Sequence, residues 1–135
     1  ERKRVMKAVQ ESGRKKKPGR KKKRKVNGCQ KGKRGEREAA KAVGEALGLK
    51  ARRGRQYSGS PDSPDILVDG LPGVHFEVKR TERFDAYSAV EQAGFDSGGK
   101  VPVVLHRRNG KPWLVAVELD RLLSLASEMQ TTIHY

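Results

Sequence analysis

The sequence predicts an α/β fold in which a mixed central sheet is flanked by helices, with a basic flexible tail at the N-terminus. Segments with a helical apolar period alternate with short strand-like runs, in the order helix, three strands, helix, two strands, helix. The net charge of +15 lies in the first quarter: residues 1–34 hold 17 Lys and Arg, whereas 35–135 hold 14 basic and 14 acidic residues. We therefore divide the chain into a tail at 1–30 and one domain at 31–135.

The run RKKKPGRKKKRKV at 14–26 dominates the tail. Such a run neutralises phosphates and adds salt-dependent, sequence-independent affinity for nucleic acid. A nuclear-import signal and a merely solubilising tail are the weaker interpretations. No aromatic residue interrupts the run, so base stacking is not expected there.

The first helix is predicted over 34–47, because its apolar residues recur at helical spacing and Gly48 follows them. A strand over 52–57 leads into the turn-rich loop YSGSPDSP, and two further strands, at 65–69 and 74–79, are joined by GLPG. These three strands form the first half of the predicted sheet.

The second half begins with a helix over 86–95 that Ser97-Gly98-Gly99 should end. Strands at 101–106 and 113–117 flank Asn109-Gly110, a type I′ hairpin signal. The last helix is predicted over 119–129. We expect its buried side to hold Leu122, Leu123 and Ala126.

Cysteine content and hydropathy limit the class of protein. The single cysteine, Cys29, excludes an internal disulfide and a multi-cysteine zinc site. No apolar run approaches the roughly 20 residues of a membrane span, and no run has the character of a signal-peptide h-region. We expect an intracellular protein of a reducing compartment, with no membrane partner.

Two carboxylates and a lysine are predicted to share one face of the first hairpin. If its turn is centred on Leu71, Asp65 lies opposite Glu77, and Lys79 follows on the same face. Two such carboxylates repel unless a cation lies between them or one is protonated. Their hard oxygen atoms suit Mg²⁺, with Mn²⁺ as a substitute, and Lys79 could orient or help deprotonate a water. The alternative is a capping Asp65 with an exposed Glu77–Lys79 ion pair.

These residues also resemble a known family. Pro64-Asp65 followed by Glu77-Val78-Lys79 is similar to the PD-(D/E)XK nuclease motif, and KGKRGER at 31–37 resembles the opening helix of archaeal-type Holliday junction resolvases. This alignment matches Glu36 and its neighbour Arg37 to the family's active-site glutamate and the residue after it. RQYSGS at 55–60 resembles the family's flexible loop, in which Ser58 would approach the scissile phosphate.

The resemblance implies a restriction-endonuclease-like core and a homodimer that cuts two strands of a four-way DNA junction. It implies Mg²⁺ bound by Asp65, Glu77 and the Val78 carbonyl, with Glu36 completing the acidic cluster and Lys79 adding positive charge. The residues expected to contact branched double-stranded DNA are Arg37, Arg52, Arg53, Arg55, Ser60, Arg80, Arg83 and Gln92.

Two alternative functions remain open at this point. The same fold could act on flaps, forks or restriction-type duplex sites, because a fold does not determine a substrate. A non-enzymatic nucleic-acid-binding protein with a structural acidic cluster is the alternative from another class. His75, His106 and His134 lack the spacing of a metal site, and we expect Phe84, Tyr87, Phe95 and Trp113 to be core or dimer contacts.

Overall fold

The computed structural model describes residues 28–54 and 63–132. Its helices are α2 (Gly28–Leu47), α3 (Ala86–Asp96), the 3₁₀ helix η1 (Leu119–Arg121) and α4 (Leu122–Thr132). Its strands are β1 (Ala51–Arg53), β2 (Ile66–Val68), β3 (Val74–Lys79), β4 (Val101–His106) and β5 (Leu114–Ala116). The predicted α/β class and the predicted element order are confirmed. Most of the basic tail and the whole of RQYSGS lie outside the described residues.

The five strands form one sheet in the order β1-β2-β3-β4-β5. β3 and β4 are parallel, and the other neighbours are antiparallel, so the sheet is mixed as predicted. The pairing of Ile66 with Phe76 has the register that a hairpin centred on Leu71 requires. In the turn before β5, the Lys111 N–H donates to the Arg108 carbonyl at 3.2 Å and Gly110 has a φ of +68°.

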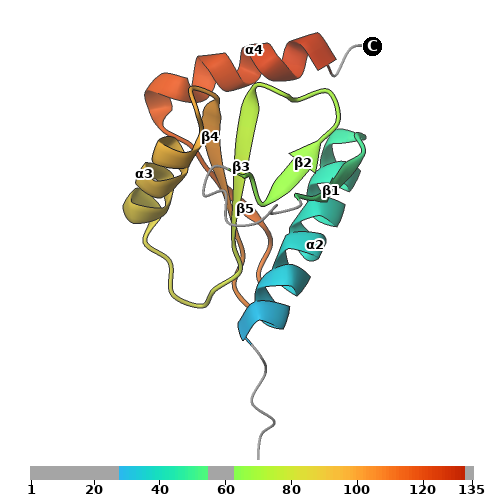
Figure 1. Cartoon of the computed structure of the whole chain (residues 1–135), viewed down its shortest axis with the longest axis vertical. Coiled ribbons are helices and arrows are strands. Elements are labelled where there is room, and N and C mark those ends of the chain that lie inside the picture. Colours follow the sequence, from blue (N-terminus) through green and yellow to red (C-terminus); the bar gives the residue numbers. More distant parts are fainter. Residues whose placement is uncertain (1–27, 55–62, 133–135) are drawn as a thin grey trace, which may run out of the picture.

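Helices cover both faces of this sheet (Figure 1). Ala39 and Ala40 of α2 and Leu125 of α4 pack into one core with Phe76 and Val103. Ala89, Val90 and Ala93 of α3 form a second core on the opposite face around Val104. β4 is buried over all six residues because its side chains alternate between these two cores.

The two ends of the sheet differ (Figure 1). α4 crosses the end at which β3 begins, and the first turns of α2 lie at the end at which β3 finishes. β3 therefore delivers Glu77 and Lys79 to the end beside α2, away from α4. The candidate site lies at that end.

α2 begins at Gly28, six residues before the predicted start. A Cβ on Gly35 would lie 2.8 Å from Cβ of Arg80, so the absence of a side chain lets this part of α2 approach the chain after β3. Tertiary packing thus supports a helix across a Gly-rich, Lys-rich segment that local propensity does not favour.

The predicted buried side of the last helix is wrong. Leu122 is 48% exposed, Leu123 is 83% exposed, and Ala126 is exposed as well. The buried positions are instead Leu125, which is 6% exposed, and the partly buried Met129 one turn later. This i, i+4 pair turns the helix so that the predicted side faces outward.

The aromatic residues divide between core and surface. Phe84 stacks on His106 with ring centroids 4.0 Å apart, and Trp113 packs against the larger core. Tyr87 and Phe95 are exposed on α3, so they are not core residues of the described chain. Within residues 28–54 and 63–132, no helix has the length and apolar character needed to cross a membrane.

Candidate acidic site

Asp65 is tied to the end of β3 through its backbone and its side chain. Its N–H donates to the Phe76 carbonyl at 3.0 Å, and its Oδ2 accepts from the Val78 N–H at 2.8 Å. The Gly54 N–H donates to the Asp65 carbonyl at 2.9 Å and so joins β1 to the same point. Three segments of chain therefore determine where this carboxylate lies.

Glu77, a residue of β3, lies next to Asp65, which directly precedes β2; this is the predicted arrangement. Its side chain is largely buried, and its Oε1 is 2.9 Å from Nε2 of the buried His75. Phe76 and Val78, the alternate residues of β3, pack into the core on the other face. The strand alternation inferred from the sequence is thus what brings Asp65 and Glu77 together; we call these two residues the acidic pair.

The electrostatics of the acidic pair are unfavourable to two negative charges. The pKa of the Asp65 carboxyl is raised from 3.8 to about 7, and burial is the largest cause. A hydrogen bond with Glu77, the charge of Glu77 and the charge of Glu36 contribute to this rise, and the Val78 N–H opposes it. A proton or another cation is therefore required when this pair is buried at neutral pH.

Glu36 approaches the acidic pair but has a partner of its own. Its charge acts on Asp65, while its Oε2 accepts a hydrogen bond from Nε of Arg53. Among the described residues, no three His, Cys, Asp or Glu side chains converge closely enough to hold a metal ion. A ligand set here would thus combine the acidic pair with a backbone carbonyl.

The donor atoms fit a hard divalent cation. Residues of a strand point their N–H and C=O to the same edge, so the Val78 carbonyl lies on the edge where its N–H meets Asp65. Two carboxylates and one carbonyl are the oxygen ligands that Mg²⁺ takes together with water and phosphate. The resemblance implies the same three ligands with Glu36 completing the cluster, and this metal site stays a prediction.

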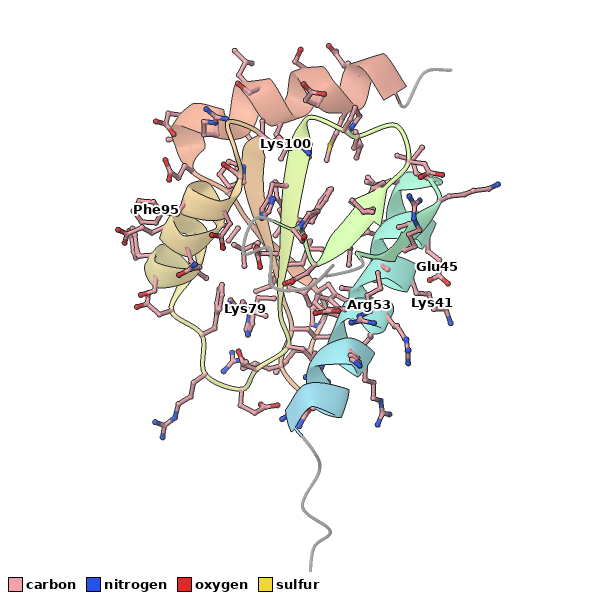
Figure 2. The ribbon with its side chains drawn as sticks, in the orientation of Figure 1. Lys41, Glu45, Arg53, Lys79, Phe95 and Lys100 are labelled. Atoms are coloured by element: carbon pink, nitrogen blue, oxygen red, sulfur yellow. The ribbon has the colours of Figure 1, made fainter. Side chains whose placement is uncertain are left out.

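Lys79 follows Glu77 on β3 and borders a small hollow. The hollow has a volume of about 260 Å³ and is lined by Lys31, Gly32, Glu36, Val78, Lys79, Arg80 and Thr81. Figure 2 shows Lys79 on the α3 side of β3 and Arg53 on the α2 side. We call this space the cationic hollow, because three of its lining residues carry positive charge.

Three of the five predicted DNA-contacting arginines that the structure describes are engaged with carboxylates. Arg52 pairs with Asp69 at 2.8 Å, Arg53 pairs with Glu36, and Nε of Arg80 lies 3.4 Å from Glu38. Arg37 and Arg83 are exposed, and no ion pair links either to a described residue. These two are therefore the freest of the predicted set within the described ranges.

The other predicted contacts are not brought to the acidic pair. The Gln92 side chain donates to Asp96 at 3.1 Å on the exposed face of α3. Arg55, Ser58 and Ser60 lie outside the described residues.

Sequence reasoning missed several charged residues near this end of the sheet. Lys31 lines the cationic hollow, and Lys33, Arg34 and Lys41 form an exposed basic stripe on α2 together with Arg37, which was predicted. The i, i+4 spacing of Lys33, Arg37 and Lys41 was the available signal, but the predicted helix started too late to include all of it. Glu38, which was not among the predicted site residues, binds both Arg80 and Arg107.

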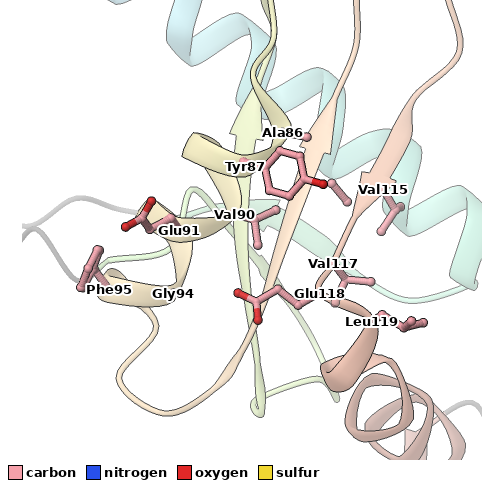
Figure 3. Close-up of a pocket in the computed structure, with 11 residues that line it drawn as sticks. Ala86, Tyr87, Val90, Glu91, Gly94, Phe95, Val115, Val117, Glu118 and Leu119 are labelled. Atoms are coloured by element: carbon pink, nitrogen blue, oxygen red, sulfur yellow. The ribbon is translucent and has the colours of Figure 1, made fainter.

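An apolar groove lies at the β5 edge of the sheet, between α3, β5 and η1 (Figure 3). Its volume is about 980 Å³, and its lining includes Ala86, Tyr87, Val90, Phe95, Val115 and Leu119. Tyr87 is 91% exposed, Phe95 78% and Leu119 85%. Exposed apolar residues so concentrated are typical of an interaction surface.

Comparison of the chain with protein-family models found no matching family, and comparisons with curated proteins and with solved structures found no match either.

Proposed function

We propose that this protein is a metal-dependent DNA endonuclease that cuts branched DNA, with the four-way junction as its substrate. The observation that carries the proposal is the acidic pair: Asp65 is held by the Val78 N–H beside Glu77, and Lys79 follows on the same strand. Glu77 is buried, Asp65 is half-buried, and the two carboxylates repel each other next to a cationic hollow, an electrostatic arrangement suited to hydrolysis of a phosphodiester.

Asp65, Glu77 and the Val78 carbonyl would hold Mg²⁺, for which Mn²⁺ can substitute. Bound there, the ion would activate water and stabilise the charge that develops on the phosphate. Lys79 would place its ammonium group against the same phosphate, and Lys31 would lie on the opposite wall of the hollow. Glu36 would act through water, since Arg53 already occupies one of its oxygens. Ser58 and Ser60 are proposed to contact the phosphate backbone from the loop 55–62.

DNA would reach this site along α2. The basic stripe on α2 is exposed and belongs to the same helix as Lys31 of the hollow. Arg37 belongs to the stripe, and Arg83 follows β3 at the same end of the sheet. Contacts from these residues and from the tail would go to phosphates, which orient a protein on DNA without reading its sequence.

A second copy of this chain is the proposed occupant of the apolar groove. Resolving a junction requires two cuts, and a single acidic pair can hydrolyse one phosphodiester at a time. An isologous dimer supplies two identical sites related by a two-fold axis, which matches the symmetry of a junction. The groove adjoins the free edge of β5, where Leu114 is 59% and Val115 60% exposed, so pairing would cover an apolar sheet edge.

The nuclease proposal is tested with a synthetic four-way junction, a flap and a linear duplex, each labelled on every strand. We expect paired cuts in the junction in the presence of Mg²⁺ and no cuts with EDTA. Asp65→Asn and Glu77→Gln should abolish cleavage while junction binding is retained, because both remove a proposed ligand. Asp69→Asn is the matched control: it removes an exposed carboxylate from the same hairpin and should cut like the wild type.

Near wild-type cleavage by Asp65→Asn would refute the assigned site. Cutting of flaps or duplex in preference to junctions would keep the site and change the substrate. Failure of the wild type to nick any DNA with Mg²⁺ or Mn²⁺ would leave the non-enzymatic binding protein as the better interpretation.

Assembly is tested separately by sedimentation equilibrium, with and without junction DNA. We expect a dimer for the wild type and a monomer for Phe95→Asp, which places a charge in the apolar groove. The monomeric variant should nick one strand at a time. A wild type that stays monomeric on the junction would contradict the resolvase assignment.

A further inference from the structure

His75 is a polar side chain buried in the middle of β3. It is 1% exposed, two residues before Glu77, and its neighbour on β4 is Pro102. A buried imidazole costs free energy unless its nitrogens find hydrogen-bond partners. An apolar residue would fill the same space without that cost. The presence of a histidine therefore points to a role for the hydrogen bond that it makes.

That hydrogen bond goes to the carboxylate of the acidic pair. Nε2 of His75 lies 2.9 Å from Oε1 of Glu77. Because an ionised carboxylate only accepts, Nε2 carries the hydrogen and donates it. Both side chains project from the same face of β3, and the Glu77 side chain is only 12% exposed, so little water competes for Oε1.

A bond to one carboxylate oxygen restricts the whole group. With Oε1 held by His75, rotation about the last side-chain torsion of Glu77 is limited, and Oε2 is the oxygen left for another partner. Asp65 lies within the reach of Glu77, since a hydrogen bond and a charge from Glu77 both act on it. The free oxygen and the Asp65 carboxylate can then face one point.

We propose that His75 is a positioning residue that orients Glu77 for binding of a divalent cation with Asp65. The inference rests on the proposed function. Hydrogen-bond partners of ligating carboxylates commonly contribute 10–100-fold to metal affinity or activity. His75 would act only through Glu77 and would touch neither the cation nor the DNA.

The test is titration of the full chain with Mn²⁺ in the absence of DNA, measured by calorimetry. His75→Gln keeps a donor near the position of Nε2, whereas His75→Met has a similar length and no donor. We expect the Gln variant to bind Mn²⁺ within about threefold of the wild type and the Met variant to bind about 10–100-fold more weakly. DNA binding without metal should be equal in all three.

His106→Met is the matched control. His106 is also buried, on the adjacent strand, but its Nε2 lies 2.9 Å from the Thr81 carbonyl and its ring stacks on Phe84. This variant loses a buried imidazole without changing a carboxylate, so its Mn²⁺ affinity should match the wild type. If His75→Met fails to fold by circular dichroism, His75→Asn replaces it, because its shorter amide cannot reach Oε1 and should lose the same affinity.

Equal Mn²⁺ affinity for the wild type and the donor-lacking variant would overturn the inference. Equal losses in His75→Met and His106→Met would also overturn it, because they would show a general effect of core disruption. A wild type that binds no Mn²⁺, or binds it equally well as Asp65→Asn, would refute the proposed metal site itself. Failure of the inference and failure of the proposed function are thus distinguished by the wild-type and Asp65→Asn titrations.

Discussion

The raised pKa of Asp65 predicts that the metal-free fold becomes more stable when this residue is replaced by Asn. The carboxyl has a pKa of about 7 in the folded chain and an ordinary value of 3.8. Between these values the folded state keeps a proton that the unfolded state has lost. Stability from this group therefore falls as the pH rises from about 4 to about 7, and the full cost remains above pH 7. Asn cannot ionise, so Asp65→Asn removes that cost.

The size of the effect follows from the shift. A difference of roughly three pKa units at about 1.4 kcal/mol each sets an upper limit near 4 kcal/mol. Part of the carboxyl faces solvent, which screens it, so about 1–2 kcal/mol is the expected gain. For a domain of this size that corresponds to a rise in Tm of about 5–10 °C.

The assay is thermal unfolding followed by circular dichroism, with EDTA, at several values between pH 4 and pH 8. The difference in Tm between Asp65→Asn and the wild type should be smallest near pH 4 and level off above pH 7. Asp69→Asn is the control in the same melts, because it removes an exposed carboxylate of the same hairpin that lies outside the acidic pair. Mg²⁺ should stabilise the wild type at pH 8 and leave Asp65→Asn unchanged. A Tm difference that does not vary with pH would refute the electrostatic explanation of this site.

Three further predictions concern single elements. Lys79→Ala should lower the cleavage rate by about 10²–10³-fold with junction binding retained, as expected for loss of a preorganised positive group. Lys111→Ala is the control and should have little effect. Comparable rates for the two variants in single-turnover assays would contradict the role of Lys79. Gly54→Ala should lower the Tm, since a Cβ there would clash with the Pro64 carbonyl oxygen. Gly94→Ala, whose Cβ would meet no atom within 4 Å, should raise the Tm slightly. An unchanged Tm for Gly54→Ala in the same melts would show that the close approach is not required. Deleting residues 1–27, which hold 14 of the 31 Lys and Arg, should weaken DNA binding and flatten its salt dependence in fluorescence anisotropy titrations, and an unchanged slope would show that the tail does not contact phosphates.

The parts of the fold that the sequence predicted well are those with unambiguous patterning. β3 and β4 match their predicted bounds because Gly-rich turns delimit two runs rich in strand-forming residues. The start of α2 was missed because Gly32 and Gly35 lower local helix propensity. Gly35 is needed because this part of the helix closely approaches Arg80, and that contact forms only after β3 has packed beside the helix. The buried side of α4 depends in the same way on which residue meets the end of the sheet.

The candidate site divides along the same line. Asp65 and Glu77 could be paired from strand periodicity and the centre of one turn, both of which are local. The partner of Glu36 could not be predicted, because Arg53 is 17 residues away and the two meet only when β1 packs against α2. The burial of His75 and its hydrogen bond with Glu77 could not be predicted for a related reason: a histidine in a strand pattern shows neither its burial nor the direction of its nitrogens.

The ion pairs inside the domain indicate that the proposed attraction to DNA and the proposed chemistry at the acidic pair depend on different parts of the chain. Arg52, Arg53 and Arg80 are each matched by a carboxylate, so they add little net positive charge around the site. Residues 1–27 contain 14 basic and 2 acidic residues, and the remainder of the chain contains 17 and 14, so most of the proposed long-range attraction to DNA would come from the tail. A cation bound by the acidic pair would offset the charge of the two carboxylates, so the site would then repel a phosphate less. Affinity for DNA and competence to cut it would therefore respond to different ions, monovalent salt at the tail and a divalent cation at Asp65 and Glu77.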